Sequence, residues 1–308
     1  MEPAAGRGGA SSRLTGLGLG LLASVMWGTV FVAGRYLVDI RGLDPMYVAA
    51  LRFNIGAVAA LLFMLAMGKG PDLRNALREL PLLILLGAIG IFGMGSCVFL
   101  SLRYTASVNS SIITNANPVF IALFAPLIGE RVPPVRVLGL VLGLAGCAVI
   151  SLQSLGEVRA GDNDLLGGLI AVGAAVCWAA YTVLGKGVSQ RRDGLACATI
   201  CLAAGGLLYL PIVLFRGAAA PLDGTQLAVA ILLGVGPSAV AMLAWYKALQ
   251  YVDASVLGPT QYIATLVGTL LGWWLLSEHI GGAFVVGGAA IVAGLWLATR
   301  RNGRAPAS

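Results

Sequence analysis

The chain has 308 residues, of which 58% are hydrophobic and only 11% are charged, and its formal net charge is +7. Soluble domains carry about 25% charged residues, so this composition excludes an ordinary soluble protein and indicates an integral membrane protein. The positive charge does not indicate nucleic acid as a partner, because basic cytoplasmic loops give membrane proteins the same excess.

Ten apolar segments follow one another along the chain. Most hold about 20 residues, which as a helix would cross a hydrocarbon core ~30 Å thick. Lipid offers the backbone no hydrogen-bond partners, so each segment is predicted to be a transmembrane helix, and the fold class to be all-α. The segments are 14–38, 46–67, 81–102, 107–128, 135–153, 165–188, 194–216, 226–249, 254–276 and 281–299.

Short polar stretches divide the chain into two units and two tails. Residues 1–13, rich in Gly, Ala and Ser, are predicted to be a disordered cytoplasmic tail, and residues 300–308 a second cytoplasmic tail. The first five segments form one unit, 14–153. An acidic external linker, 154–164, joins it to the second unit of five segments, 165–299.

The two units carry the same residues at matching places, which indicates one unit used twice. The tryptophan and basic pairs are 151 positions apart, and the glutamate pair is 148 apart. Because each unit has five helices, the second must insert upside down relative to the first. Such inverted repeats are typical of secondary transporters. The matched pairs are Trp27 with Trp178, Arg35 with Lys186, and Glu130 with Glu278.

Basic residues set the expected orientation. With both termini in the cytoplasm, the inner loops hold most of the Lys and Arg, including Lys69, Arg131 and Arg192. This bias predicts cytoplasmic termini and a multi-pass protein of the cell's inner or plasma membrane.

Short motifs follow one another in a fixed order along both units. In the first they are Trp27-Gly28-Thr29-Val30-Phe31, Leu51-Arg52-Phe53, Pro118, Glu130-Arg131, Gly139, Gly143 and Gly146, and in the second Trp178, Lys186, Glu278, Gly287 and Gly294. In this order, over about residues 14 to 299, the chain resembles the EamA-type members of the drug/metabolite transporter superfamily. The resemblance implies two inverted five-helix repeats around a central cavity. It also implies carriage of small metabolites, often the export of amino acids or related compounds.

One difference between the repeats concerns the two central helices. Ser111 stands in the fourth segment where the ninth has Pro259, so the two helices are predicted to break differently. Pro118 removes a further backbone hydrogen bond from the fourth segment.

Polar side chains in these two segments are candidates for a substrate site. Polar groups at membrane depth are costly unless they face protein or water. Ser111 and Asn115 are therefore predicted to line a substrate cavity, with Gln261 and Tyr262 on its opposite wall. The alternative is that these groups only satisfy the interrupted helix or bond a neighbouring one.

Aromatic residues supply further candidates. Trp27, Trp178 and Tyr181 lie too deep for interfacial anchors, and aromatic walls with a polar handle suit amphipathic ligands. Tyr181 follows Trp178 by three positions and shares its face. The alternative is packing against glycine. Trp245 and Tyr246, nearer a helix end, are interpreted as part of an interfacial belt.

Charged residues in or beside the segments suggest coupling or gating. Arg52 is predicted near the outer end of the second helix, where a guanidinium suits a carboxylate or snorkels to the headgroups. Asn54, near the same end, is predicted to bind substrate. Glu130 and Glu278 are the candidates for gaining and losing a proton at the bundle ends. For Glu130, an ion pair with the adjacent Arg131 is the structural alternative.

Together these patterns predict a secondary transporter that exports small organic metabolites, such as amino acids or related amphipathic compounds, by alternating access. Its halves would rock on hinges at Gly28, Pro118, Pro237 and Gly258. A non-transporting sensor or scaffold and a facilitative channel are the alternatives.

Other classes have no support in the sequence. No nucleophile with a base, phosphate-binding loop or metal-ligand cluster is present, so we expect neither an enzyme nor a cofactor or metal. The five cysteines are predicted to be packing residues. The expected partners are the metabolite and the lipid bilayer. The glycine pairs Gly139–Gly143 and Gly268–Gly272 would pack helices within one chain or in a homodimer.

Overall fold

The computed structural model describes residues 10–105, 107–153, 163–277 and 280–300. These residues form helices and no strand, and they contain ten helical spans long and apolar enough to cross a membrane. The predicted fold class is therefore confirmed. Glu278, the linker residues 154–162 and the tail residues 1–9 and 301–308 lie outside the described residues.

Several spans consist of short helices in line. Three short segments are π-helical (η1, η3, η5) and three are 3₁₀-helical (η2, η4, η6). The elements are α1 (Ala10–Arg35), η1 (Tyr36–Ile40), α2 (Pro45–Ala66), α3 (Gly70–Ala76), η2 (Leu77–Glu79), α4 (Leu80–Gly87), η3 (Ala88–Gly93), α5 (Met94–Ser101), α6 (Ser107–Thr114), α7 (Asn117–Phe124), η4 (Ala125–Ile128), α8 (Pro134–Gln153), α9 (Asp164–Arg191), α10 (Gly194–Leu207), α11 (Tyr209–Phe215), α12 (Gly224–Leu233), η5 (Gly234–Val240), α13 (Ala241–Ala248), α14 (Ala254–Leu257), η6 (Gly258–Gln261), α15 (Tyr262–Leu276) and α16 (Gly282–Thr299).

Two helices begin earlier than the sequence predicts. The third span starts at Gly70 and not at residue 81, because Pro71 stands in the first turn of α3, where a missing N–H costs no hydrogen bond. The first helix, α1, begins at Ala10, inside the segment predicted as a tail.

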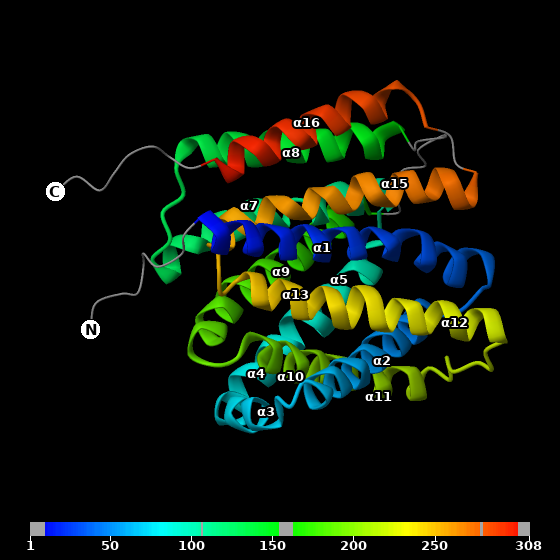
Figure 1. Ribbon diagram of the computed structural model, residues 1–308. Helices are drawn as coiled ribbons and strands as arrows, with labels where there is room; N and C mark the ends of the chain where they lie inside the picture. The colour runs from blue at the N-terminus through cyan, green and yellow to red at the C-terminus, as the bar shows by residue number, and fades with distance from the viewer. Residues whose placement is uncertain (1–9, 106, 154–162, 278–279, 301–308) are drawn as a thin grey trace.

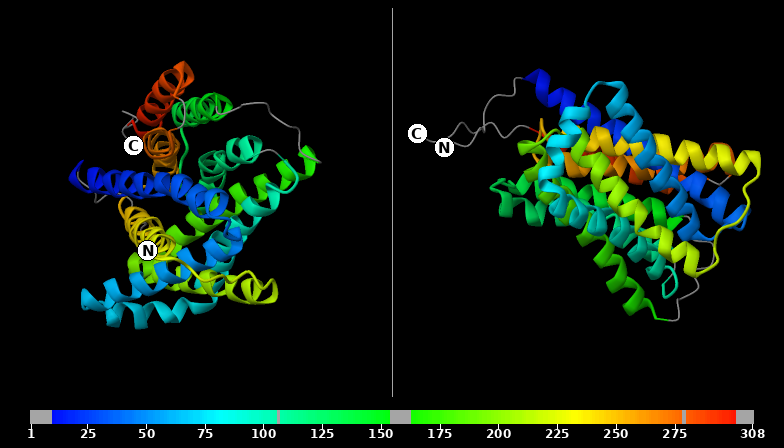
Figure 2. Two further views of the ribbon diagram at one scale, coloured as in Figure 1. Left: turned by 90° about the vertical axis from the view of Figure 1, so that its right-hand side faces the viewer. Right: turned by 90° about the horizontal axis from the view of Figure 1, so that it is seen from below.

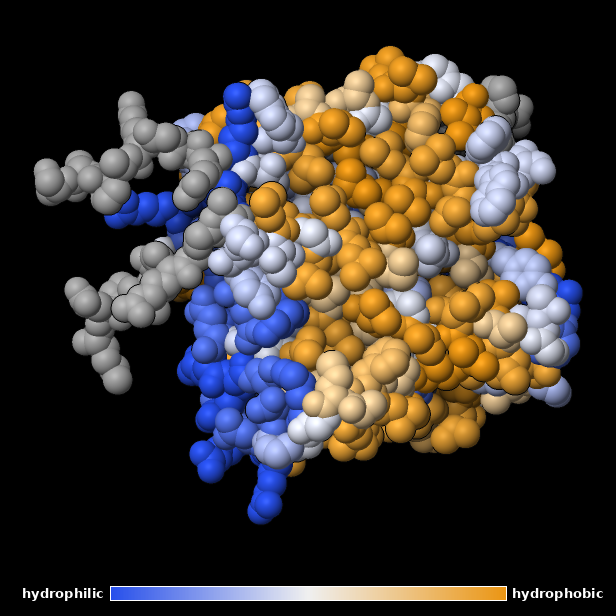
Figure 3. All heavy atoms as spheres, in the orientation of Figure 1, coloured by the Kyte–Doolittle hydropathy of each residue, from blue (hydrophilic) through white to orange (hydrophobic). Residues whose placement is uncertain are grey.

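The helices lie side by side, and the start of α1 and the end of α16 are at one end of the bundle (Figure 1). We call this the terminus end and the opposite one the far end. The α1 helix lies between α15 and α13, and α8 and α16 pair along one edge, as the end-on view also shows (Figure 2). Hydrophobic side chains cover the middle of the visible face, whereas hydrophilic ones gather at the terminus end (Figure 3).

The second spans of the two repeats are joined by two ion pairs, one at each end of the bundle. At the far end, the Asp44 carboxylate caps α2 and accepts a hydrogen bond from Arg216, just after α11, at 3.0 Å. At the terminus end, Asp193 caps α10 and accepts one from Lys69, just after α2, at 2.6 Å. This hydrogen bond raises the pKa of Lys69. Such reciprocity is what inverted repeats produce.

Close backbone approaches repeat in the same way. A Cβ on Gly56 of α2 would lie 2.9 Å from the Gly234 carbonyl oxygen of η5. A Cβ on Gly205 of α10 would lie 2.5 Å from the carbonyl oxygen of Gly87, next to η3. Gly56 and Gly205 are 149 positions apart, the offset that also separates the two capping aspartates. Each repeat thus packs its second helix against the third helix of the other repeat.

Glycines also join α8 to α16 along the edge of the bundle. A Cβ on Gly139 would lie 2.5 Å from the Gly294 carbonyl oxygen, and one on Gly146 equally close to that of Gly287. Gly268 of the second pair faces Phe31 of α1. Gly139 and Gly268, one glycine of each predicted pair, therefore pack helices within the chain.

The α8–α16 contact predicts the effect of a single methyl group. Gly146→Ala should lower the free energy of unfolding by about 1–3 kcal/mol, because the new Cβ meets a backbone carbonyl that cannot rotate away. Gly18→Ala is the matched control, since nothing lies within 4 Å of its Cβ position. Thermal unfolding of both variants in detergent micelles measures the difference. Equal melting temperatures would contradict the close packing.

Candidate functional site

Three tryptophans from three helices meet inside the bundle. The ring centroid of Trp27, on α1, lies 5.2 Å from that of Trp178 on α9 and 5.1 Å from that of Trp245 on α13. Tyr181 adjoins Trp178 at 5.3 Å, and Tyr246 adjoins Tyr181 at 5.2 Å. We call these five side chains the aromatic cluster. It contains both members of the tryptophan pair that the repeat matches in sequence.

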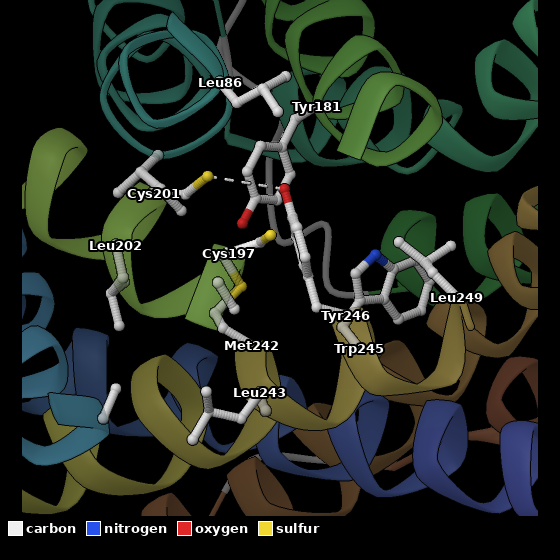
Figure 4. Packing of buried hydrophobic residues seen from close by; sticks show 14 of the residues in the cluster. Leu86, Tyr181, Cys197, Cys201, Leu202, Met242, Leu243, Trp245, Tyr246 and Leu249 are labelled. Atoms are coloured by element: carbon white, nitrogen blue, oxygen red, sulfur yellow. Dashed lines mark hydrogen bonds between the residues drawn. The ribbon is translucent and has the colours of Figure 1, made fainter. Parts of the chain in front are cut away.

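Two members of the aromatic cluster correct the sequence interpretation. Trp245 and Tyr246 were predicted to belong to an interfacial belt, yet both are fully buried. Figure 4 shows Tyr246 turned toward Tyr181 and the cysteines of α10, with Cys201 within hydrogen-bonding distance of the Tyr246 hydroxyl, and Trp245 beside Leu249. The terminus end of α13 is covered by α9 and α10, so its aromatic face cannot reach lipid.

The cluster contains buried donors without a protein acceptor. The Trp27 indole N–H donates to the Pro237 carbonyl at 3.0 Å. The indole N–H groups of Trp178 and Trp245 are buried and have no hydrogen-bond partner among the described residues. Buried polar groups are normally paired, so these donors are the groups of the cluster that remain available to a water or a solute.

A π-helical segment of the eighth span borders the cluster. The wide turns of η5 contain Pro237 and the fully buried Ser238, whose hydroxyl donates to the Leu233 carbonyl at 3.0 Å. Its counterpart in the third span, η3, packs Gly90 directly against Tyr181. Short π segments often lie at functional sites. Here each repeat contributes one beside the same group of side chains.

The structure connects Arg52 to η5. Its Nε donates to the Ser238 hydroxyl at 3.2 Å, and its Cζ lies 4.5 Å from the ring centroid of Phe53. Asn54, in contrast, donates to the carbonyls of Ala50 and Gly206 at 2.8 and 2.9 Å. The Asn54 amide therefore joins α2 to α10, and Arg52 is the residue of this pair that faces the eighth span.

The two central spans break at different heights, as the Ser111–Pro259 difference predicts. The fourth breaks at residues 115–116, after α6, and Pro118 stands in the first turn of α7. The ninth breaks nearer its start, where η6 separates α14 from α15. The proline of η6 lies within that 3₁₀ turn.

A cavity of about 150 Å³ lies between α1, α6, α8 and α15. It includes the predicted Ser111 but neither Asn115 nor Gln261. Tyr262 instead packs against Gly143 and donates to the Leu140 carbonyl at 3.1 Å. The residues that line the cavity are Phe31, Val32, Arg35, Ser111, Ile150, Ser151, Thr265, Gly268, Thr269 and Gly272.

A buried ion pair joins the repeats at the terminus end. Lys186 of α9 donates to Glu130, just after η4, at 2.6 Å, and their side chains are 7% and 5% exposed. Lys186 also donates to Asp253 at 3.1 Å. The sequence named Arg131 as the ionic partner of Glu130, but the partner is Lys186. The positive φ of 80° at Gly129 turns the chain so that Glu130 points back into the bundle.

Glu130 also caps the start of the ninth span. Its carboxylate accepts hydrogen bonds from the backbone N–H groups of Ala254 and Ser255 at 2.7 and 3.0 Å, and from the Ser255 hydroxyl at 2.9 Å. Arg136 of α8 donates to the same hydroxyl at 2.7 Å. We call Glu130, Lys186 and these contacts the terminus lock, because they tie spans four, five, six and nine together.

The predicted hinges lie in different settings. Pro118, Pro237 and Gly258 stand at or beside changes of helix type, in the first turn of α7, in η5 and at the start of η6. Gly28 lies in the uninterrupted α1, close against Val267 of α15. Among the residues that the structure describes, no three His, Cys, Asp or Glu side chains come together as metal ligands.

A bundle of ten spans in two inverted repeats, with unsatisfied polar groups at its centre, defines a carrier-type membrane protein. The model of the EamA-like transporter family matches the chain twice, over residues 14–152 and 165–300. The chain belongs to this family, as the sequence motifs predict. Membership places it among membrane-embedded transporters of small molecules and not among enzymes.

Known proteins agree with this membership. YddG, an aromatic amino acid exporter of Ancylobacter novellus, is 29% identical over 91% of this chain and 97% of the relative. A probable terminal-alkyne amino-acid exporter of Streptantibioticus cattleyicolor is 28% identical over 92% of each chain. A crystal structure that is 28% identical superposes with a TM-score of 0.80 over 92% of this chain and 97% of its own.

The terminus lock predicts strong coupling between its charges. Lys186→Met should lower the free energy of unfolding by about 3–5 kcal/mol, because it leaves the Glu130 carboxylate buried without a cation. The double variant Glu130→Gln/Lys186→Met should recover most of the loss. Thermal unfolding of purified protein measures both effects.

A matched control is Lys247→Met, since Lys247 bonds Gln250 and no acidic residue among those described. The control should unfold near the wild-type temperature. A Lys186→Met variant as stable as this control would show that the buried pair carries no such coupling.

Proposed function

We propose that this transporter exports small amphipathic metabolites of the amino-acid class by alternating access. The observation that carries the proposal is the aromatic cluster. The buried indole N–H groups of Trp178 and Trp245 have no described partner, and Trp27 donates to η5, the segment that Arg52 also contacts. Such a site offers apolar surface and a few polar contacts, which is the composition of small-molecule sites. The names of the two exporter relatives support the amino-acid class.

The arrangement at the two ends supports alternating access. The terminus lock shuts one end of the bundle with a buried ion pair. The cavity bordered by Arg35 lies near the far end of α1, and the residues of the terminus lock do not reach it. In the proposed cycle this conformation takes up or releases solute at the far end, and the lock opens when the halves rock.

We place the protein in the inner or plasma membrane of the cell, with both termini in the cytoplasm. Basic side chains at the terminus end outnumber those at the far end, where Arg41, Arg103 and Arg216 lie. The proposed units remain 14–153 and 165–299, with the linker outside. A homodimer would need another surface than Gly139 and Gly268, because both face helices of the same chain.

Counterflow in proteoliposomes tests the proposal. Vesicles that hold the protein and unlabelled L-phenylalanine should accumulate radiolabelled L-phenylalanine with saturable kinetics. Trp178→Ala should raise the half-saturating concentration about two- to tenfold, since an aromatic contact is lost. Trp274→Ala is the matched control, because its side chain is 71% exposed on the lipid-facing surface.

The result also separates the rival classes. A channel would give flux without counterflow, and a sensor or scaffold would give no flux. No saturable counterflow with aromatic or aliphatic amino acids would contradict the proposed function.

A further inference from the structure

Arg52 carries a charge inside a membrane-spanning helix without an acidic partner. It stands seven residues after Pro45, the first residue of α2, and no described Asp or Glu lies within ion-pair distance of it. Its one hydrogen bond runs from Nε to Ser238. A guanidinium has five N–H donors, so its two terminal amino groups are available to a ligand.

Charges within transmembrane helices are costly and mark functional sites unless they reach the headgroups. Snorkelling would turn the Arg52 side chain toward the far end. Instead, its Nε contacts Ser238, which is fully buried in the middle of the span Gly224–Ala248. The Phe53 ring, 4.5 Å from Cζ, stacks on the guanidinium from another side. These contacts hold the group toward the interior of the bundle.

The same π segment holds Arg52 and the aromatic cluster. Ser238, which accepts from Arg52, directly follows Pro237, whose carbonyl accepts from the Trp27 indole at 3.0 Å. Arg52 and Trp27 therefore contact adjacent residues of the same π segment.

We propose that Arg52 binds the carboxylate of the transported solute, while the apolar part of the solute contacts the aromatic cluster. The proposal rests on the proposed function and restricts its substrates to monocarboxylates, zwitterionic or anionic. The planar fork of arginine matches a carboxylate through two parallel hydrogen bonds, which an ammonium cannot reproduce. Ser238 and Phe53 position this fork.

The repeat relation shows that the charge is specific to one half. At the offset of 149, Arg52 corresponds to Cys201 of α10. The two residues have the same packing, because the carbonyl of Arg52 faces Gly234 and that of Cys201 faces Gly87. Cys201 contacts the Tyr246 hydroxyl and carries no charge. A cation on one side only gives the solute one orientation between the repeats.

Competition against radiolabelled L-phenylalanine counterflow tests the proposal on the wild-type protein. L-phenylalanine and 3-phenylpropanoate should compete, whereas phenethylamine, which has no carboxylate, and L-phenylalaninamide, whose carboxylate is masked, should compete about tenfold to a hundredfold less well. This arm needs no variant. Equal competition by the compounds with and without a carboxylate would contradict the proposed role of Arg52. The proposed transport function would not be affected.

Variants test the residue itself. Arg52→Gln should raise the half-saturating concentration of L-phenylalanine about tenfold to a hundredfold and abolish the preference over phenylalaninamide. Arg52→Lys should restore part of the affinity, because it keeps the charge without the fork. Arg103→Gln makes the same change on an exposed residue at the far end and should match the wild type.

A structural role alone predicts another result. If Arg52→Gln folds, transports and still prefers the carboxylate, the proposal is wrong. If the variant does not fold, the wild-type competition series decides. If the wild-type protein transports none of the probes, the proposed function and this proposal both fail. If it shows saturable counterflow of phenethylamine, it is a transporter but the carboxylate site is rejected.

Discussion

The arrangement of the bundle depends on two places where backbones touch without side chains between them. Gly56 of α2 allows η5 to approach, and Gly205 of α10 allows η3 to approach in the same way. In lipid, close van der Waals contact replaces the hydrophobic effect as the force that joins helices, so small residues fix which helices are neighbours. The approach at Gly56 puts Ser238 beside Arg52. The crossed contact between repeats therefore places the candidate site as well as holding the halves together.

The terminus lock adds a different kind of contact to this frame. Buried ion pairs contribute little net stability, since desolvation offsets the attraction between the charges, but a broken pair is costly. Such a contact favours two states, one joined and one fully separated. In the repeat, Arg35 corresponds to Lys186, yet it lies on the wall of the cavity at the other end of the bundle. The two ends thus differ although the sequences match, as expected of inverted repeats in one conformation of a transport cycle.

The number and type of the spans follow from the sequence, because lipid leaves a long apolar segment few alternatives to a helix. The Trp178–Tyr181 contact also follows from helical spacing. The buried position of Trp245 could not be predicted, since it depends on which helices cover α13. The partner of Glu130 was missed because Lys186 lies 56 positions away. The matched Arg35–Lys186 and Glu130–Glu278 pairs were the available signal, since a charge retained in both repeats at helix ends suggests a partner.

The frame and the Trp27–Trp178 pair are duplicated, but the charge at Arg52 is not. The capping aspartates and the glycines Gly56 and Gly205 repeat at an offset of 149, at which Arg52 corresponds to an uncharged cysteine. Symmetric contacts allow the two halves to exchange roles between conformations with little change in packing. Asymmetric side chains bind a solute in one orientation in either conformation. A carrier needs both properties, because it must move while it holds the same ligand, and a duplicated sequence provides both when some of its site residues diverge.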